Sequence, residues 1–556
     1  MGRPMLRRRM MRLGTTRMTP SLRAWGACQQ LPLRAERVRV SVQQPGAKVR
    51  WFQHGALGDQ APPGNDPTER RAQSTFLQSV DLSNMTVSDR QRLSKLIQEV
   101  VTTKANTGDF VPQVVIENLC SKYRTLAIDG KKQFLLILAR DLHVDVALVR
   151  QSLRFLDENL ALVEQADEQA VDWQHEHLER FLRSFRTARQ SLSPLHETFF
   201  QQILSQREDG MLFLVQLRAD LLQILRKNPQ HNAESSALRS LDASLKNFLA
   251  SWFSVGFLKL ERVTYEHSPG RLLEKIIRYE AVHPVGTIIE LKRRLGRGRR
   301  CFAFFHPSVP DEPLVFVHVA LVKELASSMH YIREETEHMT DETKAKAAIF
   351  YSISSTQKGL QGVDLGNFLI KEVAKALKTE HMQLETFATL SPIPQFVQWL
   401  ESRRGQPEGL VSKQEIAVVE SALRNTKIDH SIDTSQPSPL GVVLDTIALD
   451  TWFEDPALEA ALKPLLMRLG AHYIYNEKKR AKALCQVANF HIRNGAIFER
   501  LNWLADPSPK GLRQSAGLMV NYKYDLAQVE ANNENYLLHN VINIGAQPQA
   551  LLSQSS

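Results

Sequence analysis

Apolar residues recur at helical spacing through the first half of the chain. Positions three or four residues apart lie on one face of a helix, and further stripes of this kind follow at 134–138, 146–155 and 214–225. The first stripe consists of Leu93, Leu96, Ile97, Val100 and Val101. Ser88 and Gln91 have the spacing of a capping box, which predicts the start of this helix. Because no run alternates with period two, the pattern predicts an all-α bundle over 75–250.

The pattern changes after Trp252. The run from Gly256 to Val263 is typical of a short strand, and the Ser268-Pro269 pair then predicts the start of a helix. Further strands are predicted at 314–322 and 348–354, which are rich in β-branched and aromatic residues, and at 384–390. These strands alternate with helices. We therefore expect an α+β fold, with a helical bundle followed by a domain built on a mixed sheet.

Polar stretches rich in Pro, Gly or Asn mark the limits of these parts. Residues 60–65 read Gln-Ala-Pro-Pro-Gly-Asn, which is typical of a linker. The stretch from Asn425 to Leu440 is polar and Pro/Ser-rich, which predicts a surface loop. The expected organisation is a leader and linker at 1–74, a helical domain at 75–250, a second domain at 251–525 and a polar C-terminal tail at 526–556.

Nearly all of the net charge lies in the first fifty residues. They hold eleven Arg and Lys48 against one acid, Glu36, whereas the rest of the chain is close to neutral. The body thus lacks the basic stripe that nucleic-acid binding requires, and we expect no nucleic-acid partner. The leader has the Arg-rich, acid-poor composition of a mitochondrial or plastid transit peptide, and of these two locations we expect the mitochondrial matrix. A misassigned start or an unstructured basic leader would instead leave the protein cytoplasmic.

Other classes of protein are excluded by what the chain lacks. No apolar run reaches the roughly eighteen residues of a membrane-spanning helix, so we expect no membrane span. The four cysteines, at 28, 120, 301 and 485, are too scattered for a disulfide scaffold or a zinc site, and no metal site is expected. The last residues read Leu-Leu-Ser-Gln-Ser-Ser rather than Ser-Lys-Leu, so import into peroxisomes by that signal is not expected.

A glycine-bearing loop follows the strand predicted at 348–354. Gly359, Gly362 and Gly366 precede an amphipathic helix that continues to Leu377. Glycines let a ligand approach the backbone closely, and the free N–H groups at the start of a helix favour an anion. The spacing matches neither the Walker loop nor the Rossmann fingerprint. On these residues alone, a phosphate-binding loop and an ordinary strand-to-helix turn both stay open.

The order strand, glycine loop, helix and strand resembles the acetyl-CoA-binding fold of the GCN5-related N-acetyltransferases. In a similar acetyltransferase pattern a Tyr stands four residues before a Gly, and here His491 stands four residues before Gly495. Five blocks also resemble the malonyl-CoA decarboxylase family in sequence and order. They are 301–314, 350–354, 361–367, 390–394 and 487–491, and the resemblance extends over roughly residues 80 to 525.

This resemblance implies a helical N-terminal oligomerisation domain and a GCN5-related catalytic domain. It also implies conversion of malonyl-CoA to acetyl-CoA and carbon dioxide, with no metal and no cofactor apart from the coenzyme A of the substrate. Carried over by motif, the catalytic pair is Ser391 and His491. The coenzyme-binding residues are then Gln361, Gly362, Val363, Asp364, Leu365, Gly366 and Asn367.

The residue types of the pair suit this chemistry. Pro392 favours an extended Ser391, and Pro394 stiffens the turn that presents the hydroxyl. An imidazole with an ordinary pKa of about 6.5 suits proton donation near neutral pH. We expect Ser391 to orient the malonyl carboxylate and His491 to protonate C2, while a partial exchange of these roles stays open. An ordinary Ser-Pro turn and a packing histidine stay open on the residues alone, as do two rival functions, a coenzyme A-dependent N-acyltransferase and a non-catalytic coenzyme A-binding scaffold.

Overall fold

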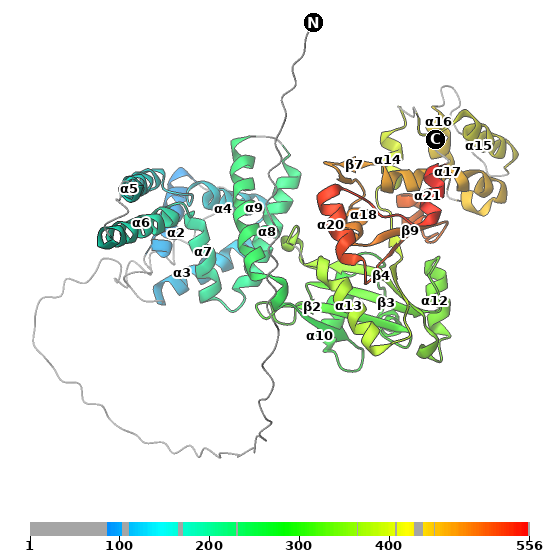
Figure 1. The fold of residues 1–556 in the computed structure, drawn as a ribbon, viewed down its shortest axis with the longest axis horizontal. Helices are drawn as coiled ribbons and strands as arrows, with labels where there is room; N and C mark the ends of the chain where they lie inside the picture. The colour runs from blue at the N-terminus through cyan, green and yellow to red at the C-terminus, as the bar shows by residue number, and fades with distance from the viewer. Residues whose placement is uncertain are drawn as a thin grey trace, which may run out of the picture. The chain divides into compact units, whose positions relative to one another are not determined.

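A computed structural model describes residues 86–102, 110–164, 171–229, 232–363, 365–405, 409–426, 438–449 and 451–553. These residues all belong to one compact unit of the chain. The predicted leader and linker at 1–74 lie outside the described residues, as does most of the loop predicted at 425–440. The predicted α+β class is confirmed: helices come first along the chain, and a mixed sheet with further helices follows (Figure 1).

The described residues between Val87 and Trp252 form helices and the turns between them. Each of the predicted apolar stripes lies on a helix, but the stripes differ in burial. Phe134 and Leu214 are fully buried, whereas Leu153 and Phe155 are exposed. The helices are α2 (Val87–Thr102), α3 (Phe110–Thr125), α4 (Ile128–Arg140), α5 (Val146–Glu164), α6 (Val171–Ser191), α7 (Leu195–Gln206), α8 (Gly210–Lys227) and α9 (Ala233–Trp252).

The predicted capping box at Ser88 and Gln91 is wrong by two residues. Thr86 Oγ1 accepts a hydrogen bond from the backbone N–H of Asp89, and the Asp89 carboxylate accepts one from the N–H of Thr86. Asp89 in the first turn also interacts favourably with the helix dipole. The acid therefore completes the box, and Ser88 lies inside the helix.

The second half is built on a mixed sheet with the strand order β1-β2-β3-β4-β5-β10-β6, and β9 pairs with β10. Neighbours are antiparallel except β4 and β5, which are parallel. The strands are β1 (Lys259–Val263), β2 (Arg299–Phe305), β3 (Val315–Val322), β4 (Ala347–Ser355), β5 (Thr386–Thr389), β6 (Ser391–Pro392), β9 (Ile497–Asn502) and β10 (Met519–Lys523); a separate hairpin joins β7 (Lys478–Lys479) to β8 (Lys482–Ala483).

The centre of this sheet is buried on both faces, and every residue of β3 is buried. On one face, Val317 and Val319 belong to the same apolar cluster as Leu369 of α13. On the other, Ala320 packs in a cluster with Ile332 of α12. The helices of this half are α10 (Gly270–Tyr279), α11 (Ile288–Arg294), α12 (Met329–Glu337), α13 (Gly366–Glu380), α14 (Phe396–Ser402), α15 (Lys413–Asn425), α16 (Pro439–Ile447), α17 (Pro456–Tyr475), α18 (Gln486–Arg493), α19 (Pro509–Ser515), α20 (Val529–His539) and α21 (Ala546–Ser553).

The predicted strands at 314–322, 348–354 and 384–390 correspond to β3, β4 and β5. The sequence analysis did not predict the strands β2, β9 and β10. Strand β2 begins with Arg299 and Arg300, and β9 has Glu499 and Arg500 at its centre, so their apolar residues do not form a continuous β-branched run.

The interpretation of 526–556 as a polar tail is wrong for the described residues of that segment. Tyr536 of α20 is fully buried, and its hydroxyl accepts a hydrogen bond from the N–H of Ala483. The Gln547 side chain of α21 exchanges hydrogen bonds with the backbone of Leu501 in β9. These helices are held by a few buried residues and by polar contacts, which leave only a weak hydrophobic period in the sequence.

Candidate active site

The structure brings Ser391 and His491, which are one hundred residues apart, into direct contact. Ser391 Oγ lies 3.0 Å from His491 Nε2. Only 6% of Ser391 and 3% of His491 is exposed. Ser391 lies on β6, where it pairs with Val520 of β10, and His491 lies on α18. The two residues assigned by motif therefore form one buried pair at hydrogen-bonding distance.

Local sequence explains the conformation of each partner. Ser391 is extended as expected before Pro392, and its strand ends within two residues because proline has no N–H to donate. His491 lies in the last turn of a short helix that leads to Gly495. Gly495 has a φ of +81°, and a Cβ at this position would lie 2.0 Å from the carbonyl oxygen of Val529. Only glycine fits this turn.

Two tyrosines that the sequence analysis missed hold the imidazole of His491. The Tyr524 hydroxyl lies 2.8 Å from Nδ1. The ring of Tyr522 stacks on the imidazole, with centroids 4.7 Å apart and planes 21° from parallel. Tyr522 and Tyr524 are two residues apart at the end of β10, and residues at this spacing in a strand share a face. The two tyrosines could have been found in the sequence from this alternation of aromatic residues.

The other side of Ser391 contacts Thr389. Ser391 donates a hydrogen bond to Thr389 Oγ1 over 2.9 Å, and the same oxygen accepts the backbone N–H of Tyr522. Tyr524, His491, Ser391 and Thr389 thus form a continuous chain of buried hydrogen-bonding groups. Such a chain holds each member in one orientation, because a buried polar group without a partner is costly.

Burial determines the charge states of these hydrogen-bonded side chains. Desolvation lowers the pKa of His491 to about 3, and it raises the pKa of Tyr524 well above 10. At neutral pH the imidazole is therefore neutral and the phenol keeps its proton. A neutral imidazole carries one N–H. When Tyr524 donates to Nδ1, the proton of His491 lies on Nε2 and is directed toward Ser391. The expectation of an ordinary pKa for His491 is thus wrong for the protein without substrate.

The loop predicted to bind the coenzyme lies at the same edge of the sheet as Ser391. Because β4 and β5 are parallel neighbours, their carboxyl ends lie at the same edge, where open α/β sheets bind ligands. The loop follows β4, and Ser391 follows β5 after one residue.

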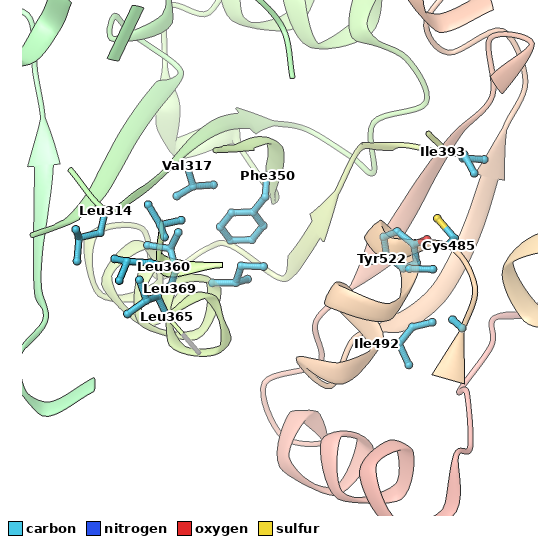
Figure 2. Packing of buried hydrophobic residues seen from close by; sticks show 14 of the residues in the cluster. Leu314, Val317, Phe350, Leu360, Leu365, Leu369, Ile393, Cys485, Ile492 and Tyr522 are labelled. Atoms are coloured by element: carbon cyan, nitrogen blue, oxygen red, sulfur yellow. The ribbon is translucent and has the colours of Figure 1, made fainter. Parts of the chain in front are cut away.

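The loop itself joins a short 3₁₀ helix, η4 (Lys358–Leu360), to α13. Gln361 caps η4, and Gly362 has a φ of +79°. Leu365 is buried, and Gly366 begins α13, while Asp364 lies outside the described residues. Val363 is half-buried against the core, and Asn367 lies in the first turn of α13. Figure 2 shows Leu360, Leu365 and Leu369 gathered near Val317 and Phe350 of the sheet. The apolar residues of the loop thus anchor its polar backbone.

Some kinds of site are missing from the part of the chain that the structure describes. No group of three or more His, Cys, Asp or Glu side chains there is arranged to hold a metal ion. Within the same residues, no helix combines the length and the apolar character needed to cross a lipid bilayer. Cys120, Cys301 and Cys485 are buried free thiols.

Two family models match the chain. The model of the malonyl-CoA decarboxylase C-terminal domain matches residues 256–555, and that of the malonyl-CoA decarboxylase N-terminal domain matches residues 162–253. Together they cover most of the described residues.

Similar proteins and solved structures agree with the family models. The chain is 39% identical over 436 residues to the mitochondrial malonyl-CoA decarboxylase of Anser anser anser, which covers 78% of this chain and 82% of that protein. It is 42% identical over 398 residues to the mitochondrial malonyl-CoA decarboxylase of Mus musculus, which covers 71% of this chain and 77% of that protein.

Two crystal structures also resemble this chain. Malonyl-CoA decarboxylase from Rhodopseudomonas palustris matches with a TM-score of 0.65 and 31% identity, over 84% of this chain and all of that one. The enzyme from Agrobacterium vitis matches with a TM-score of 0.66 and 29% identity, over 83% of this chain and 99% of that one.

Proposed function

The chain belongs to the malonyl-CoA decarboxylase family, and we propose on this basis that it is a carboxy-lyase that converts malonyl-CoA to acetyl-CoA and carbon dioxide. The observation that carries the proposed mechanism is the buried contact between Ser391 Oγ and His491 Nε2. A hydroxyl and an imidazole at hydrogen-bonding distance are the two groups that this reaction needs, one to orient the carboxylate and one to deliver a proton.

In the proposed reaction, Ser391 hydrogen-bonds the malonyl carboxylate and orients its bond to C2. Cleavage of that bond releases carbon dioxide and leaves the electron pair on C2, where the thioester carbonyl delocalises it as an enolate. Since the substrate itself stabilises this charge, we infer that no metal and no cofactor beyond the coenzyme A of the substrate is needed. The buried surroundings of Ser391 favour the loss of the charged carboxylate as a neutral gas.

His491 then delivers a proton to C2. The imidazole is neutral in the free protein, but a substrate carboxylate placed next to it favours the protonated form. Each turnover therefore takes one proton from solvent and passes it through Nε2 to the enolate, which becomes acetyl-CoA. The imidazole returns to its neutral state when carbon dioxide and acetyl-CoA have formed.

The loop from Gln361 to Asn367 is proposed to hold the pyrophosphate of coenzyme A. Support comes from its position at the carboxyl edge of β4, from the positive φ of Gly362 and from the start of α13 at Gly366. Backbone N–H groups at the start of a helix attract phosphate oxygens. The coenzyme would then extend from this loop along the sheet edge toward Ser391.

We also propose a mitochondrial matrix location and self-association through the helical domain. The similar animal proteins are named mitochondrial, and the basic leader has the composition of a transit peptide. On α5, the exposed Leu148, Phe155 and Leu162 are spaced seven residues apart, and Leu182 and Phe185 are exposed on α6. Apolar stripes of this kind mark protein–protein contacts.

Product analysis tests the proposed function. Purified full-length protein incubated with malonyl-CoA should release carbon dioxide and form acetyl-CoA in equal amounts. Ser391→Ala and His491→Ala should each lower kcat by about a hundredfold or more, and His491→Ala should still bind coenzyme A. His330→Ala, which changes an exposed histidine of α12, is the control and should keep full activity.

Two outcomes would contradict this function. Consumption of acetyl-CoA only when an amine is added, without carbon dioxide from malonyl-CoA, would indicate an N-acyltransferase. Coenzyme A binding with no turnover before or after the substitutions would indicate a scaffold.

A further inference from the structure

Two helices of the N-terminal domain contact the loop that is proposed to hold the coenzyme. A Cβ added at Gly359 of η4 would lie only 1.8 Å from the carbonyl oxygen of Val215 in α8. A Cβ added at Gly362 would lie 3.4 Å from Cε of Lys246 in α9. The backbone of η4 therefore packs directly against the backbone of α8, so that no larger residue fits at Gly359, and the loop lies beside the Lys246 side chain of α9 at Gly362.

Arg218 of α8 stabilises the contact of α8 and α9 with η4 and the loop. It is 2% exposed, and its Nη1 donates to the carbonyl oxygens of Gly359 and Gln361, over 2.6 and 2.9 Å. Its Nε donates to Asp242 Oδ1 of α9 over 2.8 Å. One guanidinium thus joins α8 and α9 to one carbonyl of η4 and one carbonyl of the loop.

The chemistry of the contact suits arginine. The last carbonyl groups of a helix accept no hydrogen bond from within that helix. The two carbonyl groups that Arg218 binds lie at the end of η4. The planar guanidinium donates in several fixed directions at once, which a lysine ammonium does not reproduce. A second arginine, Arg226, lies two turns further along α8 and contacts the side chain of Gln361.

We propose that Arg218 is a positioning residue for coenzyme A. By holding the carbonyls on both sides of Leu360, it sets the path by which the backbone enters Gly362 and the first turn of α13. The helical domain then determines how tightly the loop holds the pyrophosphate, in addition to any role in self-association. This inference rests on the proposed role of the loop in the decarboxylase reaction.

A comparison of two thioesters tests the inference in the full-length protein. Malonyl-CoA carries the pyrophosphate, whereas malonyl-N-acetylcysteamine has the same reacting group without it. Arg218→Lys should raise KM for malonyl-CoA tenfold or more and leave kcat within about threefold. The same variant should turn over malonyl-N-acetylcysteamine with a kcat/KM within about threefold of the wild-type value.

Matched variants separate positioning from folding. Arg207→Lys replaces another largely buried arginine of the helical domain, one that pairs with Asp209, and it should leave the ratio of the two thioesters unchanged. Asp242→Asn keeps the guanidinium but removes its charged anchor, so it should raise KM for malonyl-CoA in the same direction by a smaller factor. It serves as the second test where Arg218→Lys does not yield folded protein.

Equal losses on both thioesters, or no rise in KM for malonyl-CoA, would overturn the inference while leaving the decarboxylase reaction intact. If wild-type protein releases no carbon dioxide from either thioester, the proposed function fails instead. In that case coenzyme A binding decides the inference by itself, and Arg218→Lys must weaken it at least tenfold.

Discussion

At the scale of single residues, the candidate active site is a chain of four side chains rather than a pair. Tyr524, His491, Ser391 and Thr389 are joined by contacts of 2.8, 3.0 and 2.9 Å. Tyr524, at one end of this row of hydrogen-bonded side chains, is important because the hydrogen bond at Nδ1 of His491 decides which imidazole nitrogen carries the proton. The phenol, held protonated by burial, favours a proton on Nε2, the nitrogen that faces Ser391.

This arrangement predicts the effect of Tyr524→Phe. Loss of the hydroxyl removes the partner of Nδ1, so His491 loses its fixed tautomer while the aromatic packing stays. We expect kcat to fall about 10- to 100-fold, the size typical of a group that orients a functional histidine, with KM for malonyl-CoA nearly unchanged. Steady-state kinetics measure both constants.

Tyr522→Phe is the matched control for this prediction. Tyr522 meets the imidazole through its ring, and the ring is retained in phenylalanine, so kcat should stay within about threefold of wild type. Equal losses in the two variants would show that aromatic packing rather than the Tyr524 hydrogen bond supports His491.

At the scale of secondary-structure elements, the position of His491 depends on the turn that ends α18. Gly495 lies at φ +81° with its Cα directed against the backbone of Val529 in α20. The chain turns there into β9, which pairs with β10 and so places the helix beside Tyr522 and Tyr524. A change at Gly495 therefore affects the helix, the strand and the site together.

We predict that Gly495→Ala destabilises the protein more than Gly409→Ala. Gly409 has nearly the same φ, +79°, but open space around it. Both variants pay the strain of a left-handed alanine, about 1 kcal/mol. Only the Cβ at 495 must also push Val529 away, which adds about 1–3 kcal/mol. Urea unfolding of the two variants gives the difference, and equal losses would contradict the packing seen at Gly495.

At the scale of the whole molecule, the centre of the sheet differs from helices α5 and α6 in what it leaves exposed. The centre of the sheet is covered on both faces, whereas α5 and α6 expose large apolar side chains. On α6, Leu178, Leu182 and Phe185 follow one another at intervals of four and three residues, which places them on one face. This face is the proposed contact between copies of the chain.

We predict that Leu182→Glu combined with Phe185→Glu yields a smaller assembly than the wild-type protein. The charges would be buried without partners in the contact, which is costly. Light scattering after size-exclusion chromatography measures the mass of each species. Arg183→Glu combined with Arg186→Glu changes exposed polar positions of the same helix and should keep the wild-type mass. A monomeric wild-type protein would contradict the proposal.

How much of the fold could be predicted depended on the length of each periodic run. Strand β3 is apolar except for His318, and β4 begins with five apolar or aromatic residues, so both runs predicted strands. The order of β4, loop, α13 and β5 followed from the glycines and the amphipathic helix between two predicted strands, whereas the parallel pairing of β4 with β5 was not predicted from the sequence. Strand β10 was missed because Met519–Lys523 is short and mixes polar and aromatic residues, and its partners lie far away in the sequence.

The amino-acid sequence by itself determined the fold class, the glycine loop and the motifs that contain Ser391 and His491, because these depend on local periods and on residue types at short spacing. Only the tertiary structure decided that the two residues touch, that Tyr524 faces the imidazole and that Arg218 holds the loop. Each of these contacts joins elements that are distant in sequence. The pairing of β6 with β10 and the close approach of α8 to η4 create these contacts. A local sequence pattern does not specify which residue from a distant part of the chain will make such a contact.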